Sequence, residues 1–184
     1  IMKHFKIIIL IILFLFNYKS YADENIVEIL KKNNNIIFIR HSLAPGTGDP
    51  ENINLNDCKT QRNLNIEGIN QAKKIGNFFK INNIKVENVF SSEWCRCKDT
   101  ALYAFADYKI FDALNSFYSE KFYKNKNKQI FELKKFINNW DKKSNLFLVT
   151  HYIVIMELLG VGVASGEILI SNKNYEILEK LQIN

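Results

Sequence analysis

Four β-favouring apolar residues are followed directly by two ionisable ones in the segment Ile36-Ile37-Phe38-Ile39-Arg40-His41. A continuous apolar run of this length is typical of a strand buried on both faces, as in a parallel sheet covered by helices. Further along the chain, Leu146-Phe147-Leu148-Val149-Thr150-His151 repeats the arrangement. The two runs therefore predict two inner strands, each of which ends beside a histidine.

Helical patterns alternate with strand patterns along the rest of the chain. Asn65 is predicted to cap a helix whose apolar positions recur with a helical period over residues 66–79. The other expected elements are helices over 23–32, 94–105, 126–140 and 152–159, a strand over 86–90, and a closing strand or hairpin over 167–171 and 175–178. This alternation predicts a single α/β domain with a mostly parallel sheet.

The N-terminal segment has the layout of a secretory signal peptide. Lys3 and Lys6 precede an apolar run over residues 7–16, and Ser20-Tyr21-Ala22 is a small-x-small cleavage pattern. Because the run is too short to span a hydrocarbon core of ~30 Å as a helix, an uncleaved membrane anchor is the less favoured alternative. We expect a signal peptide over residues 1–22, a domain over 23–184, a periplasmic or secreted location, and no stable membrane insertion after cleavage.

Part of the basic charge belongs to that segment. The 184 residues carry a formal charge of +6, and 47% of them are hydrophobic, which allows a packed core and excludes a disordered chain. Cleavage would remove Lys3, Lys6 and Lys19 and lower the charge to +3. Since no nucleic-acid motif accompanies the remaining lysines, no nucleic-acid partner is expected.

A long loop is expected over residues 42–63, which contain several glycines and prolines. Loops of this length in compact domains are usually functional or fixed by additional bonds, and a disulfide at Cys58 could fix this one. The three cysteines allow at most one internal disulfide, and Cys95 and Cys97 are too close to pair comfortably within a helix. We expect Cys58 to pair with one of them. A zinc site is disfavoured because there is no C-x-x-C spacing.

The chemistry-bearing residues converge at the ends of the predicted strands. In open α/β sheets, ligands bind beyond the carboxyl ends of the strands, where His41 and His151 would face one pocket. Arg40 adjoins the first histidine, and Arg96 lies in the first turns of a helix that follows Ser91-Ser92. One guanidinium group can donate two parallel hydrogen bonds to the oxygens of a phosphate, so these two arginines and two histidines suit a phosphoryl group.

Four segments, in order, resemble the histidine phosphatase (phosphoglycerate mutase-like) superfamily. They are Arg40-His41-Ser42, Arg62-Asn63-Leu64-Asn65-Ile66-Glu67-Gly68 with Gln71-Ala72, Ser91-Ser92-Glu93-Trp94-Cys95-Arg96-Cys97-Lys98-Asp99-Thr100-Ala101, and Thr150-His151. The resemblance covers residues 36–151 and is to exported, branch-1-type phosphatases. It implies a three-layer α/β/α fold of the phosphoglycerate mutase type.

The resemblance also implies roles for the site residues. His41 would be the nucleophile that becomes phosphohistidine, Arg40, Arg96 and His151 would hold the phosphoryl oxygens, and Arg62 would assist near the pocket. No metal and no cofactor would be needed. Thr100 is interpreted as a hydrogen-bonding or packing residue of its helix rather than as a reactant.

The proton donor to the leaving group does not stand in a recognisable motif. Glu120 is our choice from its distance along the sequence, with Asp112, Glu167 or no acid at all as the alternatives. Two residues depart from the family pattern. Ser42 replaces a glycine and adds a hydroxyl, and Cys97 replaces an alanine, which we interpret as a sign of a structural disulfide.

The function expected is hydrolysis of a phosphate monoester, with a small phosphorylated substrate such as an envelope sugar phosphate. The alternative is a non-catalytic phosphate- or phosphosugar-binding module, because Ser42 is atypical and the acid is missing. Aromatic residues in the segment 109–128 are candidates for stacking on a sugar, although core packing is the commoner role. They are Phe111, Phe117, Tyr118, Phe122 and Tyr123.

Overall fold

The computed structural model describes residues 25–183 of the chain. The expected signal peptide over residues 1–22 lies outside the described residues. Within them, no helix combines the length and the apolar character that a membrane crossing requires.

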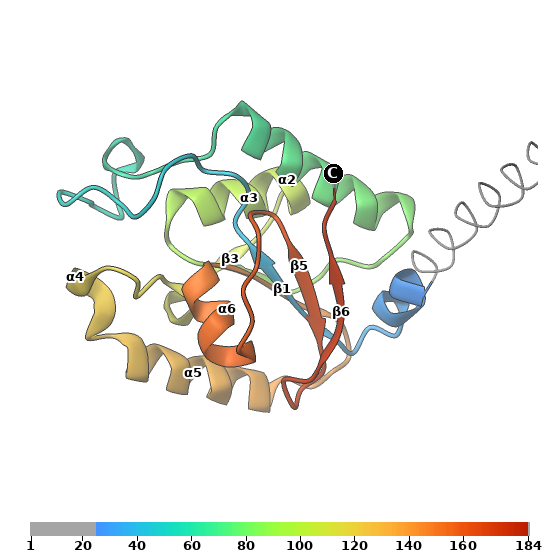
Figure 1. The fold of residues 1–184 in the computed structure, drawn as a ribbon. Coiled ribbons are helices and arrows are strands. Elements are labelled where there is room, and N and C mark those ends of the chain that lie inside the picture. Colours follow the sequence, from blue (N-terminus) through green and yellow to red (C-terminus); the bar gives the residue numbers. More distant parts are fainter. Residues whose placement is uncertain (1–24, 184) are drawn as a thin grey trace, which may run out of the picture.

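A six-stranded sheet forms the centre of the fold, in the order β3-β2-β4-β1-β5-β6 (Figure 1). The strands are β1 (Ile36–Arg40), β2 (Val89–Ser91), β3 (Lys109–Ile110), β4 (Leu146–Thr150), β5 (Ile168–Ser171) and β6 (Ile177–Leu181). The pairs β2–β3, β2–β4 and β1–β4 are parallel, whereas β5 runs antiparallel to both β1 and β6. The prediction of a mostly parallel sheet is therefore confirmed, with β5 as the reversed strand.

Helices cover both faces of this sheet and make three layers (Figure 1). On one face lie α2 (Ile66–Ile81) and α3 (Cys95–Phe105), and on the other lie α5 (Lys126–Asn139) and α6 (Tyr152–Leu159). Residues 25–31 form a further helix, which contributes Ile26 and Leu30 to the core on the α2–α3 side of the sheet.

The inner strands β1 and β4 are apolar throughout because each contributes to two cores. Ile37 and Ile39 pack with the α2–α3 side, whereas Ile36 and Phe38 pack with the α5–α6 side. All four are 0% exposed. Each buried aliphatic or aromatic side chain of this size contributes roughly 1.5–3 kcal/mol to folding. The continuous apolar run was therefore correctly interpreted as a strand covered on both faces.

Two expected strands differ from those observed. The strand expected over 86–90 begins only at Val89, because Asn88 has a φ of 51° and cannot continue an extended chain. The strand expected over 175–178 is β6, which begins after Tyr175, where φ is 66°. The expected helix boundaries agree with the structure to within two residues wherever the residues are described.

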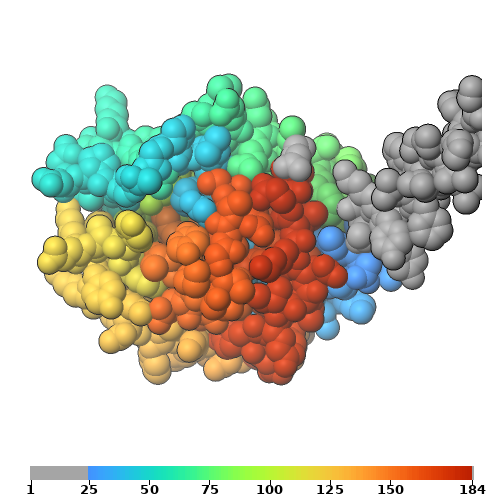
Figure 2. Space-filling model, in the orientation of Figure 1, coloured from blue at the N-terminus to red at the C-terminus, as the bar shows by residue number. Residues whose placement is uncertain are grey.

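The chain after β1 forms the long loop that the prolines and glycines predicted. Its last part contains a short 3-10 helix, η1 (Cys58–Thr60), and a disulfide joins Cys58 to Cys95 at the first residue of α3. In Figure 2 this loop, in cyan, lies on the side of the molecule where the yellow segment near residue 120 and the orange α6 also meet. The disulfide therefore ties the loop to the helix that carries Arg96.

Candidate functional site

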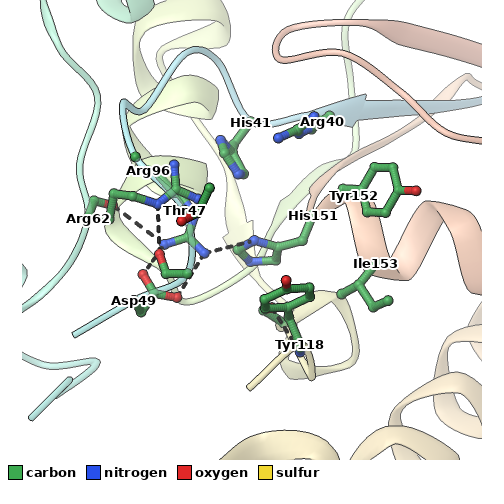
Figure 3. A pocket seen from close by; sticks show the side chains of 13 residues that line it. Arg40, His41, Thr47, Asp49, Arg62, Arg96, Tyr118, His151, Tyr152 and Ile153 are labelled. Atoms are coloured by element: carbon green, nitrogen blue, oxygen red, sulfur yellow. Dashed lines mark hydrogen bonds and ion pairs between the residues drawn. The ribbon is translucent and has the colours of Figure 1, made fainter. Parts of the chain in front are cut away.

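A pocket of about 280 Å³ lies at the carboxyl ends of β1 and β4 (Figure 3). It is lined by the end of β1, the long loop, α3, the segment after η2 (Asp112–Leu114) and the start of α6. The lining residues are Arg40, His41, Gly46, Thr47, Gly48, Asp49, Arg62, Arg96, Ser116, Tyr118, His151, Tyr152 and Ile153. Five of the six residues predicted for the site, namely Arg40, His41, Arg62, Arg96 and His151, thus lie in one pocket.

The sixth predicted residue, Glu120, lies elsewhere. It is exposed at the start of the short helix α4 (Glu120–Tyr123) and does not line the pocket. The alternatives Asp112 and Glu167 do not line it either. Glu167 instead accepts a hydrogen bond from the backbone N–H of Ala164, at 2.6 Å. The carboxylate in the pocket is that of Asp49.

His41 is buried and held in a single tautomer. Its Nδ1 lies 2.9 Å from the carbonyl oxygen of Ser42, and because a carbonyl only accepts, Nδ1 must carry the hydrogen. The lone pair is therefore on Nε2. Burial, followed by the positive charge of Arg96, holds the pKa of His41 well below its ordinary value of 6.5. His41 is thus a neutral imidazole with an available ring nitrogen.

His151 is oriented by a chain of hydrogen bonds whose direction is fixed. Asn115 Oδ1 accepts from the Ser92 hydroxyl at 3.0 Å, so the Ser92 oxygen accepts from His151 Nε2 at 2.9 Å. His151 Nδ1 then accepts from Arg96, at 3.4 Å. Burial, and after it the charge of Arg96, lowers the pKa of His151 well below 6.5. The rings of His41 and His151 lie edge to face, with their centres 5.5 Å apart.

Arg96 is held by Asp49 through both of its terminal nitrogens. Nη1 lies 2.5 Å from Asp49 Oδ1, and Nη2 lies 3.0 Å from Oδ2 (Figure 3). The side chain of Arg96 is 4% exposed and that of Asp49 is 11% exposed. Trp94 also donates to Asp49, from Nε1 at 3.0 Å. Nothing in the spacing of the sequence marked Asp49, since the loop conformation alone brings it to Arg96.

Arg40 and Arg62 bind backbone carbonyls rather than carboxylates. Arg40 donates to the carbonyl of Val163 at 2.6 Å, and its Nε is buried without a hydrogen-bond partner among the described residues. Arg62 donates to the carbonyls of Ala44 and Gly48 and so fixes the loop. Within residues 25–183, neither guanidinium has a carboxylate within ion-pair distance. The pocket therefore holds three guanidinium groups against one carboxylate, which favours an anionic ligand.

The hydroxyl at Ser42 adds no hydrogen bond among the described residues. Ser42 is 0% exposed, and its hydroxyl has no hydrogen-bond partner among the described residues. Its φ is not positive, so a glycine is not needed there. The departure from the glycine of the family pattern therefore leaves the backbone after His41 in an ordinary conformation.

The aromatic segment divides between core and pocket. Phe117 is 1% exposed and packs with the α5–α6 core, and Phe122 packs against Trp94 with ring centres 5.0 Å apart. Tyr118 is 67% exposed and lines the pocket. Tyr152 also lines it, below the guanidinium of Arg40 at 5.7 Å.

Cys97 is not part of the disulfide, so our interpretation of its place in the family pattern is wrong. It is free, fully buried, and 3.4 Å from His151 Nε2. Burial raises the pKa of its thiol to about 12, which makes it unreactive near neutral pH. Among residues 25–183 there is also no group of three His, Cys, Asp or Glu side chains placed to hold a metal ion.

The sequence matches no family model and no curated protein. Solved structures do resemble the fold. The protein histidine phosphatase SixA in complex with tungstate shares 12% identity at a TM-score of 0.55, over 80% of this chain and 96% of that chain. A candidate alpha-ribazole-5'-P phosphatase from Escherichia coli shares 16% sequence identity at a TM-score of 0.55, over 83% of this chain and 96% of that chain. Phosphoglycerate mutase from Thermus thermophilus shares 14% sequence identity at a TM-score of 0.53, over 82% of this chain and 99% of that chain. The chain therefore has the fold of the histidine phosphatases and phosphoglycerate mutases.

Proposed function

We propose that this chain is a phosphatase of the histidine phosphatase superfamily that hydrolyses a phosphate monoester through a phosphohistidine on His41. One observation carries the proposal. A buried, neutral imidazole with its lone pair on Nε2 lies in a pocket where three arginines face one carboxylate. Such a nitrogen is a nucleophile, and the guanidinium groups stabilise the charge on the equatorial oxygens of a transferring phosphoryl group.

The reaction has two displacement steps. In the first, Nε2 of His41 forms a bond to phosphorus while the bond to the alkoxide oxygen breaks, and that oxygen takes up a proton from solvent water. In the second, a water molecule attacks phosphorus and loses a proton, the bond to Nε2 breaks, and its electron pair returns to the ring. The products are an alcohol and inorganic phosphate. No metal ion or cofactor takes part in this scheme.

The substrate proposed is a small phosphorylated molecule outside the cytoplasm, such as an envelope sugar phosphate. The disulfide between Cys58 and Cys95 is consistent with an oxidising compartment, where such bonds persist. The exposed ring of Tyr118 at the pocket offers a flat apolar surface to a sugar or other leaving group. No nucleic-acid partner and no stable membrane insertion are proposed.

A second candidate is a phosphate- or phosphosugar-binding module without turnover. It is favoured by the engagement of Asp49, the carboxylate of the pocket, with Arg96, which leaves the leaving-group oxygen without a free carboxyl beside it. If this candidate were correct, the pocket would bind phosphate and His41 would accept a phosphoryl group without releasing it.

The test measures phosphate release from p-nitrophenyl phosphate together with labelling by a 32P phosphoramidate donor. The native protein should turn over and should carry an acid-labile label, and His41→Ala should lose both while it still folds, as a cooperative thermal transition shows. Glu51→Gln, an exposed change in the same loop, is the matched control and should keep both. Full activity in His41→Ala would contradict the mechanism. Labelling without turnover would favour the binding module, and a folded protein that takes up no label would exclude the phosphohistidine route.

A further inference from the structure

The terminal nitrogens of Arg96 are saturated by acceptors from the protein itself. Nη1 donates to Asp49 Oδ1 and, at 3.5 Å, to the carbonyl of Arg62. Nη2 donates to Asp49 Oδ2 and to His151 Nδ1. Each of these nitrogens carries two hydrogens, so each hydrogen has a protein acceptor. Only Nε of Arg96 is left, and it is buried without a partner among the described residues.

A phosphoryl group bound through the paired nitrogens of Arg96 would need the hydrogens that Asp49 now accepts. Paired binding of a carboxylate and paired binding of a phosphate use the same two parallel N–H groups of a guanidinium. Both groups are also anionic, and they would repel each other at this separation. Asp49 and a phosphoryl group are therefore alternative occupants of one position.

We propose that Asp49 is an internal competitor for the phosphoryl site: its carboxylate holds Arg96 in the resting protein, and the phosphoryl group of the substrate displaces it. This inference rests on the proposed function, because it takes Arg96 as a phosphoryl ligand. After hydrolysis the carboxylate returns to Arg96 and assists the release of inorganic phosphate. Asp49 thus raises the KM for substrate and weakens inhibition by the product.

The backbone before Asp49 is held by contacts that do not involve the Asp49 side chain. Arg62 holds the carbonyls of Ala44 and Gly48 on the side that precedes Asp49. Gly48 has a φ of 65°, a conformation that glycine adopts without strain. In the proposed displacement, rotation of the Asp49 side chain breaks its bonds to Arg96 and Trp94, and Arg62 keeps the loop beside the pocket.

Two other roles for Asp49 make different predictions. A purely structural ion pair, which stays closed when an anion binds, would stabilise the fold, and loss of its charge would change anion affinity no more than loss of another carboxylate of the loop. A proton donor would affect the rate for poor leaving groups and would change anion affinity to the same small extent. Competition is distinguished from both because it changes the affinity of an unreactive anion far more than the loss of a charge elsewhere in the loop does.

The experiment compares native protein, Asp49→Asn and Glu51→Gln for the dissociation constant of tungstate by calorimetry and for the inhibition constant of inorganic phosphate. Asparagine keeps the size of the side chain and removes its charge. We expect Asp49→Asn to tighten both constants by about tenfold, since the fraction of molecules with a free Arg96 rises. Glu51→Gln removes the same charge from an exposed position of the loop, outside the pocket lining, and should change neither constant.

Each result decides between the roles. If the dissociation constant of tungstate and the inhibition constant of phosphate are unchanged in a folded Asp49→Asn variant, the proposal is overturned. A loss of stability alone would then indicate a structural ion pair, and a slower rate on alkyl phosphates relative to p-nitrophenyl phosphate would indicate a proton donor. If the native protein hydrolyses p-nitrophenyl phosphate through His41, but both anion constants are the same in native protein and Asp49→Asn, the competition is rejected and the proposed function stands. If neither native protein nor variant binds tungstate or releases phosphate, both are lost.

Discussion

The hydroxyl of Thr100 accepts a hydrogen bond from the backbone N–H of Ser42, at 2.9 Å, and so links α3 to the residue that follows His41. The same hydroxyl donates to the carbonyl of Arg96, at 2.7 Å. Thr100 is 0% exposed. Together with the bonds of the His41 backbone to Thr150 and Gly166, this contact helps to hold the chain at the histidine, although Thr100 makes no hydrogen bond to either imidazole.

Thr100→Val should remove this link without changing the shape of the side chain. The N–H of Ser42 would be buried without an acceptor, which costs about 1–3 kcal/mol in the free energy of unfolding. Thr100→Ser keeps the hydroxyl and should lose less stability. Denaturant unfolding of the three proteins measures the difference, and equal stability of the valine and serine variants would show that the hydrogen bond contributes nothing.

Gly68→Ala should be strongly destabilising because α2 passes directly against the backbone of Leu43. A Cβ at Gly68 would lie 2.0 Å from the carbonyl oxygen of Leu43, so α2 or the segment after β1 would have to shift, at a cost of about 1–3 kcal/mol or more. At Gly162 the nearest atom to such a Cβ is 3.4 Å away, in the ring of Tyr152. Gly162→Ala is the matched control, and thermal melts should show a lowered melting temperature only for Gly68→Ala.

Reduction of the disulfide should lower the free energy of unfolding by about 4 kcal/mol, the chain-entropy value for the 37-residue separation of Cys58 and Cys95. Denaturant unfolding with and without dithiothreitol measures it. Cys97→Ala keeps the bridge and should respond to dithiothreitol like the native protein, whereas Cys58→Ser/Cys95→Ser should not respond. Native protein with the same stability in both conditions would contradict the expectation.

Acid should destabilise the fold through the two buried histidines. The unfolded chain protonates each near pH 6.5, whereas burial and Arg96 keep the folded pKa values of His41 and His151 well below that. Below about pH 6.5 the unfolded state therefore binds more protons than the folded state. As the pH is lowered through this range, the free energy of unfolding decreases by up to about 1.4 kcal/mol per pH unit for each histidine. Unfolding curves between about pH 7 and 5 measure the slope. His41→Asn should flatten it, and an unchanged slope would mean that His41 is not held neutral.

The sequence was most informative where a single physical requirement acts over several residues. β1 and β4 need apolar side chains on both faces, and that requirement is written directly into Ile36–Arg40 and Leu146–Thr150. The helices that cover them follow a helical period for the same reason. The two-residue strand β3 has both residues exposed at the edge of the sheet, so no burial pattern announces it.

The site was predictable as far as it depends on strand ends and on family segments. These place His41, His151 and the three arginines at one pocket. The contact of Asp49 with Arg96 depends on the path of the loop between Ser42 and Arg62, which is set by Gly46, Gly48 and the carbonyls that Arg62 binds. Such a path leaves no periodic trace in the sequence. For the same reason, sequence distance alone pointed to Glu120 rather than to Asp49 as the acid nearest the site.

Trp94 gives the molecule an optical reporter of its own pocket. Its indole N–H is bonded to Asp49, its ring lies against His151 with centres 5.3 Å apart, and it is 1% exposed. The other of the two tryptophans, Trp140, packs with the α5–α6 core on the opposite face of the sheet. Indole fluorescence responds to the charges and hydrogen bonds around the ring. With Trp140 replaced by phenylalanine, the emission of Trp94 would follow the Asp49 carboxylate as it binds and leaves Arg96, in real time and without an added label.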